Sequence, residues 1–312
     1  MSTRKTVLVF RTGHLGDTVC AIPALRLLRR HFADSELVFL CDQPQGAKVP
    51  APAVIERLNL FDRVVTYTSG RGLLSVGQLF RAVRRVQPDT VIMLPQSRDA
   101  LSNVRRKKRF FERCGVADVR GFQLPHAQRR WHANEAARLV QLLNGMGVPG
   151  AKPAYEIAPD VGSRATMERK LQAAGIAPAQ PFVLFCGGGK APTQCWPLER
   201  YGAVLTELAQ ATQYEIVGLG SPHEVAQYRA HILPQFPALR LFTEPLTLTE
   251  MFELSRRAVL YVGNDTGPMH VAASVGCPVA VVMSARNAPG SWDPDVEPHL
   301  VIRHRTDCED CF

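Results

Sequence analysis

The sequence of 312 residues lacks any apolar run long enough to cross a bilayer, because no segment approaches about 18 consecutive apolar residues. Near its start, MSTRKTVLVF, the apolar stretch is too short for the hydrophobic core of a secretory signal peptide. Regularly spaced cysteines are also missing. These absences predict a globular protein that stays in the cytoplasm.

Aromatic residues are scarce, at 7% of the sequence, and they do not alternate with basic residues in any repeat. Proteins that bind single-stranded nucleic acid stack the bases on aromatic side chains, so nucleic acid is a disfavoured partner. Lys and Arg nevertheless give a net charge of +9. This charge favours an anionic partner such as a nucleotide, a phosphorylated glycan or an anionic bilayer. The densest basic run, NVRRKKRFFER at 103–113, is either the solvated face of a helix or a contact for such an anion.

The eight cysteines are scattered, and Cys41 and Cys186 lie inside apolar strand candidates, where a thiol acts as a small buried hydrophobe. This usage fits a reducing compartment. Cys308 and Cys311 form the one close pair, but a structural zinc site would need further ligands that the adjoining sequence does not supply. We therefore expect no metal there.

Apolar runs alternate with helical patterns along the chain, which is the rhythm of a parallel sheet covered by helices on both faces. In the first half we expect strands near 5–10, 36–41, 62–67 and 89–94, with helices at 18–31, 73–86 and near 132–146. In the second half we expect strands at 181–186, 214–219, 239–242, 258–262 and 278–283, with helices near 198–211, 222–231 and 248–256.

A stretch rich in Pro and Gly, GVPGAKPAYEIAP, separates the two halves and places a boundary near 150–158. The predicted fold class is α/β, with two doubly wound, Rossmann-like domains at 1–155 and 156–312. Ligands of such sheets bind beyond the carboxyl ends of the strands, so the loops that follow strands are the places to look for chemistry.

The first such loop, RTGHLGDTVCAIPAL at 11–25, contains Gly13, Gly16 and Asp17. Its glycines allow close approach of the backbone, but the G-x-G-x-x-G spacing of dinucleotide-binding proteins is absent. A nicotinamide-dependent dehydrogenase is therefore disfavoured. Asp17 has two interpretations, as the N-cap of the following helix or as a carboxylate with a chemical role.

The second loop, CGGGKAPTQCWPLERY at 186–201, places three glycines and Lys190 after a strand, like a phosphate cradle. The P-loop pattern fails, because Leu184 stands at its first glycine position and Ala191 follows the lysine. Kinase or NTPase chemistry is thus disfavoured. The alternative is a surface turn that binds nothing.

Two further loops are rich in polar residues. In GLGSPHEVAQ at 218–227, Glu224 either accepts ribose hydroxyls or only complements the helix dipole. In GNDTGPMHVAASVG at 263–276, a helix starts near Thr266 and Gly267, so backbone N–H groups there are suited to an anion. Asp265 as a plain N-cap and His270 as a packed core histidine are the alternatives.

These four loops, taken in order, resemble glycosyltransferase family 9, the ADP-heptose:lipopolysaccharide heptosyltransferases and their relatives. The resemblance rests on GHLGDTVCAIPAL, WPLERY, GLGSPHE and above all GNDTGPMHVAASVGCPV, and it covers essentially the whole chain. It implies a GT-B fold, in which two Rossmann-like domains face each other across a cleft. It also implies an N-terminal domain that binds the acceptor and a C-terminal domain that binds the nucleotide sugar.

The resemblance implies a role for each matching residue. Asp17 would be the general base, Glu224 would bind the ribose, and the donor's pyrophosphate and sugar would contact Asp265, Thr266, Gly267 and His270. The acceptor-side residues would be Gly13, His14, Gly16 and Arg98. One match fails: Gln194 stands where family members commonly have a phosphate-binding lysine, so either Lys190 supplies the charge or the donor differs.

The implied reaction is an inverting transfer of a sugar, without a metal or other cofactor, to a lipopolysaccharide-core or related glycan. The motif WDPDVEP offers Asp293 and Asp295 as an Asp-x-Asp pair, but its composition is typical of a turn. The implied partners are ADP-heptose and an anionic glycan or glycolipid, with peripheral contact at the inner membrane. Relatives that use another donor, that act on O-antigen, capsule or small molecules, or that only bind nucleotide sugars remain alternatives.

Overall fold

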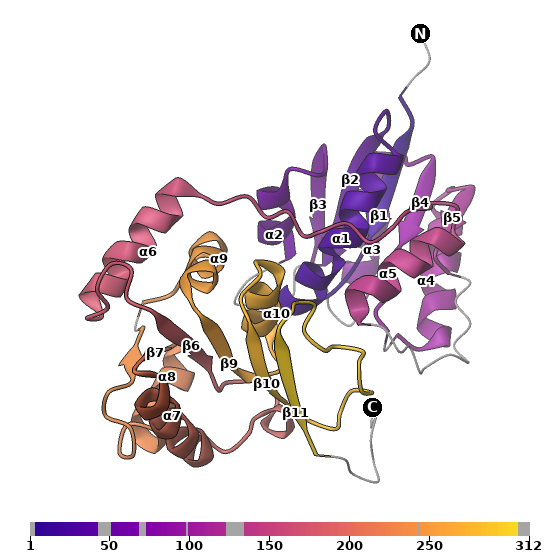
Figure 1. The fold of residues 1–312 in the computed structure, drawn as a ribbon. Coiled ribbons are helices and arrows are strands. Elements are labelled where there is room, and N and C mark those ends of the chain that lie inside the picture. Colours follow the sequence, from indigo (N-terminus) through magenta and orange to yellow (C-terminus); the bar gives the residue numbers. More distant parts are fainter. Residues whose placement is uncertain are drawn as a thin grey trace. The chain divides into compact units, whose positions relative to one another are not determined.

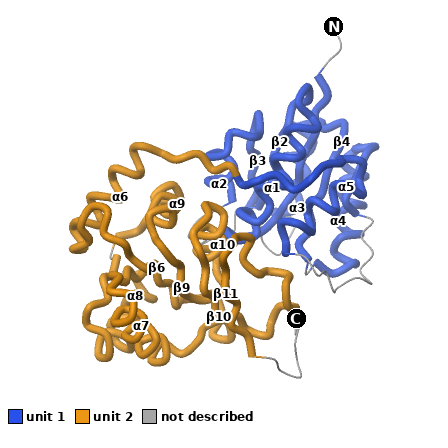
Figure 2. The backbone as a smooth tube through the Cα atoms, viewed as in Figure 1, with its two compact units in different colours: residues 1–155 blue, residues 156–312 orange. Residues whose placement is uncertain are grey.

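The computed structural model describes residues 4–42, 51–68, 73–97, 99–122, 134–242 and 244–304 (Figure 1). The chain separates into two compact units, which we call unit 1 (residues 1–155) and unit 2 (residues 156–312), each built on its own parallel sheet (Figure 2). Among the helices in these described ranges, none has the length and apolar character needed to cross a bilayer.

Unit 1 contains a five-stranded parallel sheet with the strand order β3-β2-β1-β4-β5. Its strands are β1 (Thr6–Phe10), β2 (Glu36–Asp42), β3 (Arg63–Tyr67), β4 (Thr90–Met93) and β5 (Asp118–Arg120). Its helices are α1 (Leu15–His31), α2 (Ala51–Leu58), α3 (Leu73–Val86), α4 (Leu101–Arg113) and α5 (Glu135–Gly145).

Alternate residues of β1 enter different cores, as the two-residue period of a strand requires. Val7 and Val9 pack in one cluster with side chains of α1, α2 and α5, whereas Leu8 and Phe10 pack in another with side chains of α3 and α4. Helices therefore cover both faces of the sheet, and the four apolar residues of β1, Val7 to Phe10, are all buried.

Unit 2 contains a six-stranded parallel sheet with the order β11-β10-β9-β6-β7-β8. Its strands are β6 (Phe182–Cys186), β7 (Glu215–Gly218), β8 (Arg240–Leu241), β9 (Leu260–Asn264), β10 (Val279–Met283) and β11 (His299–Arg303). Its helices are α6 (Val161–Ala173), α7 (Leu198–Thr212), α8 (Pro222–His231), α9 (Leu248–Arg257) and α10 (Gly267–Ser274), and a 3-10 turn covers Pro192–Gln194.

The two α/β units and all the strands expected from the apolar runs are confirmed. Four elements were not expected: α2, α6, β5 and β11. β5 has only three residues, and β11 alternates half-buried and exposed positions at the edge of the sheet, so neither carries a long apolar run. The basic run at 103–113 is helical, within α4.

Candidate functional site

Asp17 lies in the first turn of α1, not before it. The helix begins at Leu15 with His14 as its N-cap, and Oδ2 of Asp17 accepts a hydrogen bond from the backbone N–H of His14 at 2.8 Å. Of the two interpretations of Asp17, the N-cap is therefore wrong, because the carboxylate lies at the third helical position and caps the helix from inside. The side chain is largely buried, with 5% of Asp17 exposed.

The turn before Asp17 requires glycine at position 13. Gly13 has φ +151°, and a Cβ atom there would lie 2.5 Å from Cβ of Asp17. Its N–H donates to Oδ1 of Asp42, at the end of β2 (3.2 Å), while Nε2 of Gln96 donates to the carbonyl of Thr12 (2.9 Å). The end of β2 and the loop after β4 thus hold the loop that carries Asp17. Gly16 is the second residue of α1.

A group of buried charged side chains, which was not predicted from the sequence, holds this loop in place. Arg11, Glu135 and Arg138 are each no more than 2% exposed. The guanidinium of Arg11 donates twice to the carbonyl of Asp17 (2.7 and 3.1 Å) and once to that of Leu94 (3.1 Å). Glu135 accepts from both arginines, with its shortest contact 2.6 Å from Nε of Arg138.

The signals for this ion group were present but weak. Arg11 directly follows an apolar strand, and Glu135 and Arg138 are three residues apart at the start of a helix, which places them on one helical face. No local sequence pattern links Arg11 to the helix that carries Glu135 and Arg138. Arg98, the remaining residue expected on the acceptor side, lies outside the described residues.

In unit 2, the glycine-rich loop after β6 is held by Asn264, the last residue of β9. Nδ2 of this fully buried amide donates to the carbonyls of Gly187 (2.6 Å) and Gly188 (3.3 Å). Its Oδ1 accepts from the backbone N–H of Trp196 (3.2 Å) and from the hydroxyl of Tyr201 (2.8 Å). Because β9 and β6 are neighbours, one side chain organises both ends of the loop.

Glu224 is the third residue of α8 and closes a capping box with Ser221. Its Oε2 accepts from the backbone N–H and the hydroxyl of Ser221, both at 2.6 Å. The carboxylate also lies against Gly188, where a Cβ would overlap Oε1 of Glu224. The loops after β6 and β7 therefore meet at this carboxylate. Its first-turn role is confirmed, and contact with a ribose stays a prediction.

Two thiols near this carboxylate are kept protonated. Burial, followed by the charge of Glu224, raises the pKa of Cys186 to about 11. The same two causes raise the pKa of Cys195. Cys186 is buried within β6, as expected for a cysteine inside an apolar strand.

The acidic turn after β9 leads into α10. Thr266 is the N-cap of that helix and Gly267 its first residue, so the alternative of Asp265 as a plain N-cap is wrong. Asp265 instead accepts from Nδ2 of Asn287 (3.1 Å) and lies 3.6 Å from Nε2 of His270. His270 is 6% exposed and its ring lies edge-on to Trp292. Packing of this histidine is confirmed.

Lys190 and Gln194 lie between the glycines and α7. Lys190 is exposed, and Gln194 is half-buried as the last residue of the 3-10 turn. The residues expected to contact the donor thus belong to three loops, which follow β6, β7 and β9. Because β9, β6 and β7 are adjacent in the sheet, these loops gather at one edge.

The described ranges contain no group of three or more His, Cys, Asp or Glu side chains arranged to hold a metal ion. Asp293 of the Asp-x-Asp pair instead forms an ion pair with Arg303 at 2.9 Å. Cys308 and Cys311 lie outside the described residues.

Comparison with known proteins connects this geometry to a family. The family model described as glycosyltransferase family 9 (heptosyltransferase) matches residues 76–312. Lipopolysaccharide heptosyltransferase 3 of Escherichia coli is 26% identical over 154 residues, a match that covers 47% of this chain and 43% of that protein. The chain thus spans less than half the length of this curated relative.

Solved structures support the same fold. A family 9 glycosyl transferase from Veillonella parvula has a TM-score of 0.77 at 19% identity, covering 97% of this chain and 87% of that chain. The ADP-heptose lipopolysaccharide heptosyltransferase II of Escherichia coli has a TM-score of 0.69 at 18% identity, covering 97% and 91%. The expected GT-B class is that of these neighbours.

Proposed function

Because the chain belongs to glycosyltransferase family 9 (heptosyltransferase), we propose that it transfers a heptose from ADP-heptose to a hydroxyl group of an anionic glycan or glycolipid of the lipopolysaccharide core. One observation carries the proposal: the glycine-rich loop, Glu224 and the start of α10 gather at one edge of the sheet. Asn264 connects two of them, because its side chain bonds to the glycine-rich loop and its backbone leads into the turn before α10. This arrangement offers backbone N–H groups and a carboxylate to a nucleotide diphosphate.

In this proposal unit 2 binds the donor. Glu224 accepts hydroxyl groups of the ribose, while Lys190 and the N–H groups at the start of α10 offset the negative charge that grows on the departing pyrophosphate. Asp265 and His270 border the same helix start and contact the donor's diphosphate or sugar. The reaction then proceeds without a metal ion or cofactor.

Unit 1 supplies the base. The carboxylate of Asp17 accepts the proton of the acceptor hydroxyl as that oxygen attacks the anomeric carbon and the bond to the pyrophosphate breaks. A base opposite the leaving group implies inversion, with no covalent intermediate on the protein. The acceptor is anionic in this proposal because unit 1 carries the basic helix α4.

A second candidate donor follows from Gln194. Where family members commonly have a lysine, this chain has a neutral amide, and the exposed Lys190 is the nearby cation of the loop. A relative of this family that uses another nucleotide sugar, on an O-antigen, capsule or small-molecule acceptor, is therefore the alternative. A noncatalytic nucleotide-sugar-binding protein is disfavoured by the buried, tightly held Asp17.

The donor is tested by a thermal-shift panel of nucleoside diphosphates and nucleotide sugars. A ligand at about 100 times its Kd adds roughly 2.7 kcal/mol to the free energy of unfolding, so the preferred base will stand out. We expect ADP and ADP-heptose to give the largest shifts. A larger shift with UDP or GDP would support the alternative donor, and no shift with any nucleotide would contradict both.

The cation is tested by Lys190→Ala. If Lys190 contacts the diphosphate, the variant should bind ADP about 1.5–3 kcal/mol more weakly in calorimetry, the range for hydrogen bonds to charged groups. Gln194→Lys should then bind ADP equally well or more tightly. Arg229→Ala, which removes another exposed cation of unit 2, is the matched control. Unchanged affinity in Lys190→Ala would remove this lysine from the site.

The base is tested by Asp17→Asn, whose amide oxygen can still accept the N–H of His14. General-base catalysis is typically worth about 10²–10⁴-fold, so kcat should fall by that factor while ADP affinity changes little. Glu250→Gln is the matched control, because Glu250 is also the third residue of a helix and caps it in the same way. Transfer by Asp17→Asn at nearly the wild-type rate would point to another base, with His14 the next candidate.

The donor turn is tested by Asp265→Ala and His270→Ala. Both residues border the start of α10, so both variants should lose kcat/KM for the donor while remaining folded. Melting curves recorded beside the kinetics separate this outcome from a structural one. Strong destabilisation with normal kinetics would show that the pair only packs the turn.

A further inference from the structure

The segment that follows β10 reaches the turn that carries Asp265. β10 and β9 are parallel neighbours in which Val282 pairs with Asn264, so both strands end at the same edge of the sheet. The segment after β10 therefore starts beside Asp265, which is the first residue after β9. Two side chains of this segment, those of Asn287 and Trp292, are buried.

This segment is fixed to the sheet of unit 2 by Arg303 of β11. The guanidinium of Arg303 pairs with Asp293 (2.9 Å) and contacts Sδ of Met283, the last residue of β10 (3.2 Å). Within the segment, the hydroxyl of Ser291 donates to the carbonyl of Ala288 (2.7 Å). The position of the segment is therefore set by the two strands that it connects.

Asn287 contacts the Asp265 carboxylate in one defined orientation. Nδ2 of Asn287 lies 3.1 Å from Oδ2 of Asp265. Because an ionised carboxylate only accepts hydrogen bonds, the amide must present its N–H group here. The other oxygen, Oδ1, lies 3.6 Å from Nε2 of His270, whose ring packs edge-on to Trp292. Asn287 and His270 thus define the direction of the carboxylate.

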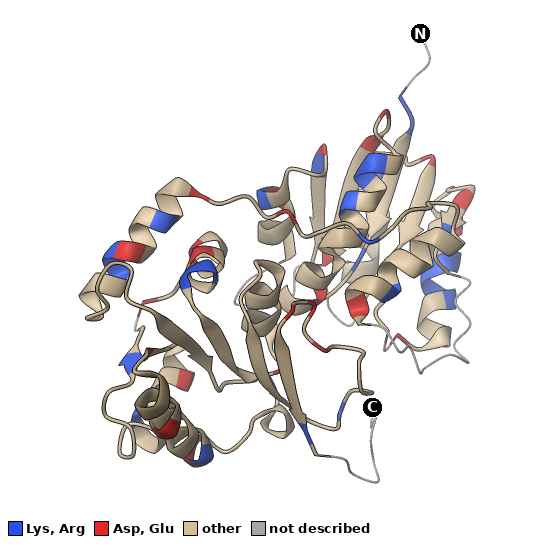
Figure 3. Ribbon diagram, in the orientation of Figure 1, with Lys and Arg blue, Asp and Glu red and all other residues tan. Residues whose placement is uncertain are grey.

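This direction matters because of the helix that follows. α10 contains no Lys, Arg, Asp or Glu, and its ribbon carries neither charge colour in Figure 3. Its N-cap, Thr266, makes no capping hydrogen bond with its side chain. The N–H groups of the first turn are therefore not used by the N-cap side chain, and the helix start favours an anion.

Asp265 is itself an anion and directly precedes this helix start. A carboxylate released from Asn287 would be free to accept N–H groups there, as aspartates at helix starts commonly do. It would then compete with the donor's diphosphate for the same N–H groups and repel its negative charge. The amide of Asn287 offers the carboxylate a different donor.

We propose that Asn287 is a positioning residue of the donor site. It holds Oδ2 of Asp265, so that Oδ1 faces His270 and the start of α10 stays open to the donor's diphosphate. Asn287 touches no substrate and acts only through Asp265. The inference rests on the proposed function, because that function assigns the start of α10 to a nucleotide diphosphate.

Calorimetry with ADP and the full chain tests this role. Asn287→Ala should weaken ADP binding about tenfold, which is the scale of a lost hydrogen bond to a charged group. Asn287→Asp should weaken it further, because the new carboxylate repels that of Asp265. Asn144→Ala, which removes an exposed amide contact to Gly150 in unit 1, is the control and should bind ADP as wild type.

A double-mutant cycle separates action through Asp265 from any other role. When Asp265 is already replaced by Ala, Asn287→Ala should change ADP affinity by less than about twofold, the usual limit of additivity. Equal losses in the two backgrounds would overturn the proposal. A large fall in Tm with unchanged ADP affinity in Asn287→Ala would overturn it too, by showing that the amide only packs the segment.

The contacts are also tested without a nucleotide, by NMR of the protein labelled with ¹⁵N in its nine histidines. The ring resonances of His270, identified by their absence from His270→Gln, should shift in Asn287→Ala and in Asp265→Ala, but not in Asn144→Ala. Unchanged resonances in Asn287→Ala would overturn the positioning role even in an active transferase. If these resonances shift but the wild type binds no nucleotide, the transferase proposal fails, and the hold of Asn287 on Asp265 stands.

Discussion

The two units hold their proposed functional loops with different chemistry. In unit 1 the loop of Asp17 is held by buried charged side chains, in which Glu135 pairs with both Arg11 and Arg138. In unit 2 the glycine-rich loop is bonded to the neutral amide of Asn264, which in turn accepts from the hydroxyl of Tyr201. Loss of one ion leaves uncompensated charge in the interior, while loss of an amide leaves only unpaired dipoles. The loop of unit 1 should therefore be much more sensitive to substitution.

The units also share one local motif that does not distinguish function. Asp17, Glu224 and Glu250 are each the third residue of a helix, and each accepts the backbone N–H of the N-cap. Burial raises the pKa of Glu250, but the N–H of Thr247 and the ammonium of Lys170 outweigh it and lower the pKa overall. Glu250 forms an ion pair with Lys170 in the body of unit 2, and Asp17 and Glu224 lie against glycines of loops that follow strands. The capping interaction alone therefore does not distinguish Asp17 and Glu224 from Glu250; their place beside the glycine-containing loops does.

The largest effect is expected for Glu135→Gln. The substitution leaves Arg11 and Arg138 buried without their carboxylate, which typically costs about 3–5 kcal/mol. Urea unfolding followed by circular dichroism measures the loss, with the transition of each unit fitted separately. The control is Glu112→Gln, in an exposed pair with Lys108, which should cost about 0–1 kcal/mol. Similar costs for the two variants would show that burial of the ion group does not set the cost, and a cost for Glu135→Gln no larger than that for Asn264→Ala would contradict the contrast between the units.

A smaller loss is expected for Asn264→Ala. It leaves the hydroxyl of Tyr201 and the carbonyl of Gly187 unpaired in the interior, at a cost of about 1–3 kcal/mol. Because both ends of the glycine-rich loop are then released, ADP should also bind more weakly. Asn144→Ala, which removes an exposed amide contact to Gly150, is the control for stability. If Asn264→Ala is destabilised but binds ADP as tightly as wild type, Asn264 supports the fold and does not shape the donor site.

Gly188→Ala should have a moderate effect, because its Cβ would displace the Glu224 carboxylate from Ser221. Loss of a helix-capping interaction costs about 0.5–2 kcal/mol, and affinity for ADP should fall with it. Gly77→Ala in α3 is the opposite control, since a Cβ there meets nothing within 4 Å. It should stabilise unit 1 by about 0.5–1 kcal/mol. Thermal melts with and without ADP measure both changes.

The smallest effect concerns pH and Asp62 of unit 1. Partial burial raises the pKa of Asp62, but the N–H of Leu37 and the guanidinium groups of Arg29 and Arg4 outweigh it, so the pKa lies below the usual value. The resulting stability is present above the unfolded-state pKa of about 3.9 and is lost as pH falls through the lower folded-state pKa.

Asp62→Asn should therefore lower Tm at neutral pH, and the difference from wild type should shrink as pH falls below about 3.9. Asp34→Asn, at an exposed carboxylate of the same unit, is the control and should change little at any pH. A difference between Asp62→Asn and wild type that stays constant into strong acid would show that Asp62 acts through packing and not through its charge.

Sequence patterns predicted those elements whose formation depends on neighbouring residues. Apolar runs predicted β1 and β6 because strands of a parallel sheet are buried on both faces. They did not predict β11, whose exposed Leu300 and Ile302 alternate with half-buried residues. The start of α1 was placed too late, because the pattern does not show that Asp17 bonds backward to His14. The roles of Asp17, Glu224 and Asp265 in transfer stay predictions.

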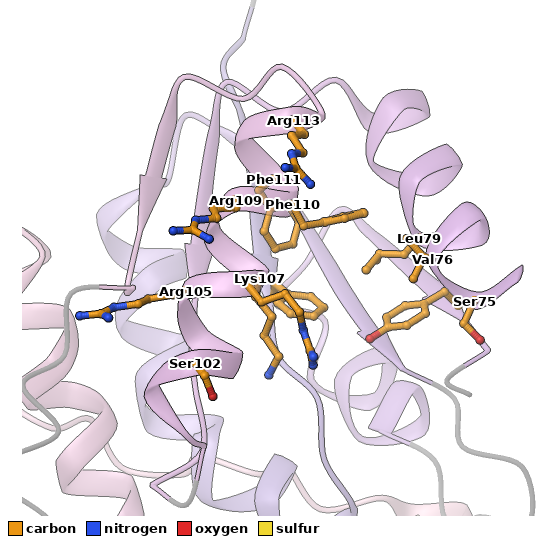
Figure 4. Close-up of a pocket in the computed structure, with 13 residues that line it drawn as sticks. Ser75, Val76, Leu79, Ser102, Arg105, Lys107, Arg109, Phe110, Phe111 and Arg113 are labelled. Carbon is orange, nitrogen blue, oxygen red and sulfur yellow. The ribbon is translucent and has the colours of Figure 1, made fainter. Parts of the chain in front are cut away.

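The two α/β units and the order of the loops could be predicted from the amino-acid sequence, because hydrophobic period, glycine placement and helix starts act over a few residues. Which distant groups meet depends on the folded arrangement of the strands and helices. Arg11 bonds to Glu135 across 124 positions, and Asn264 bonds to Gly187 across 77. Such pairings depend on the order of strands in a sheet and on which helix covers each face, and that order has no signature in local spacing. The same holds for a pocket of unit 1 between α3 and α4, which is lined by both helices and by Phe10 and Tyr67 at the ends of two strands (Figure 4).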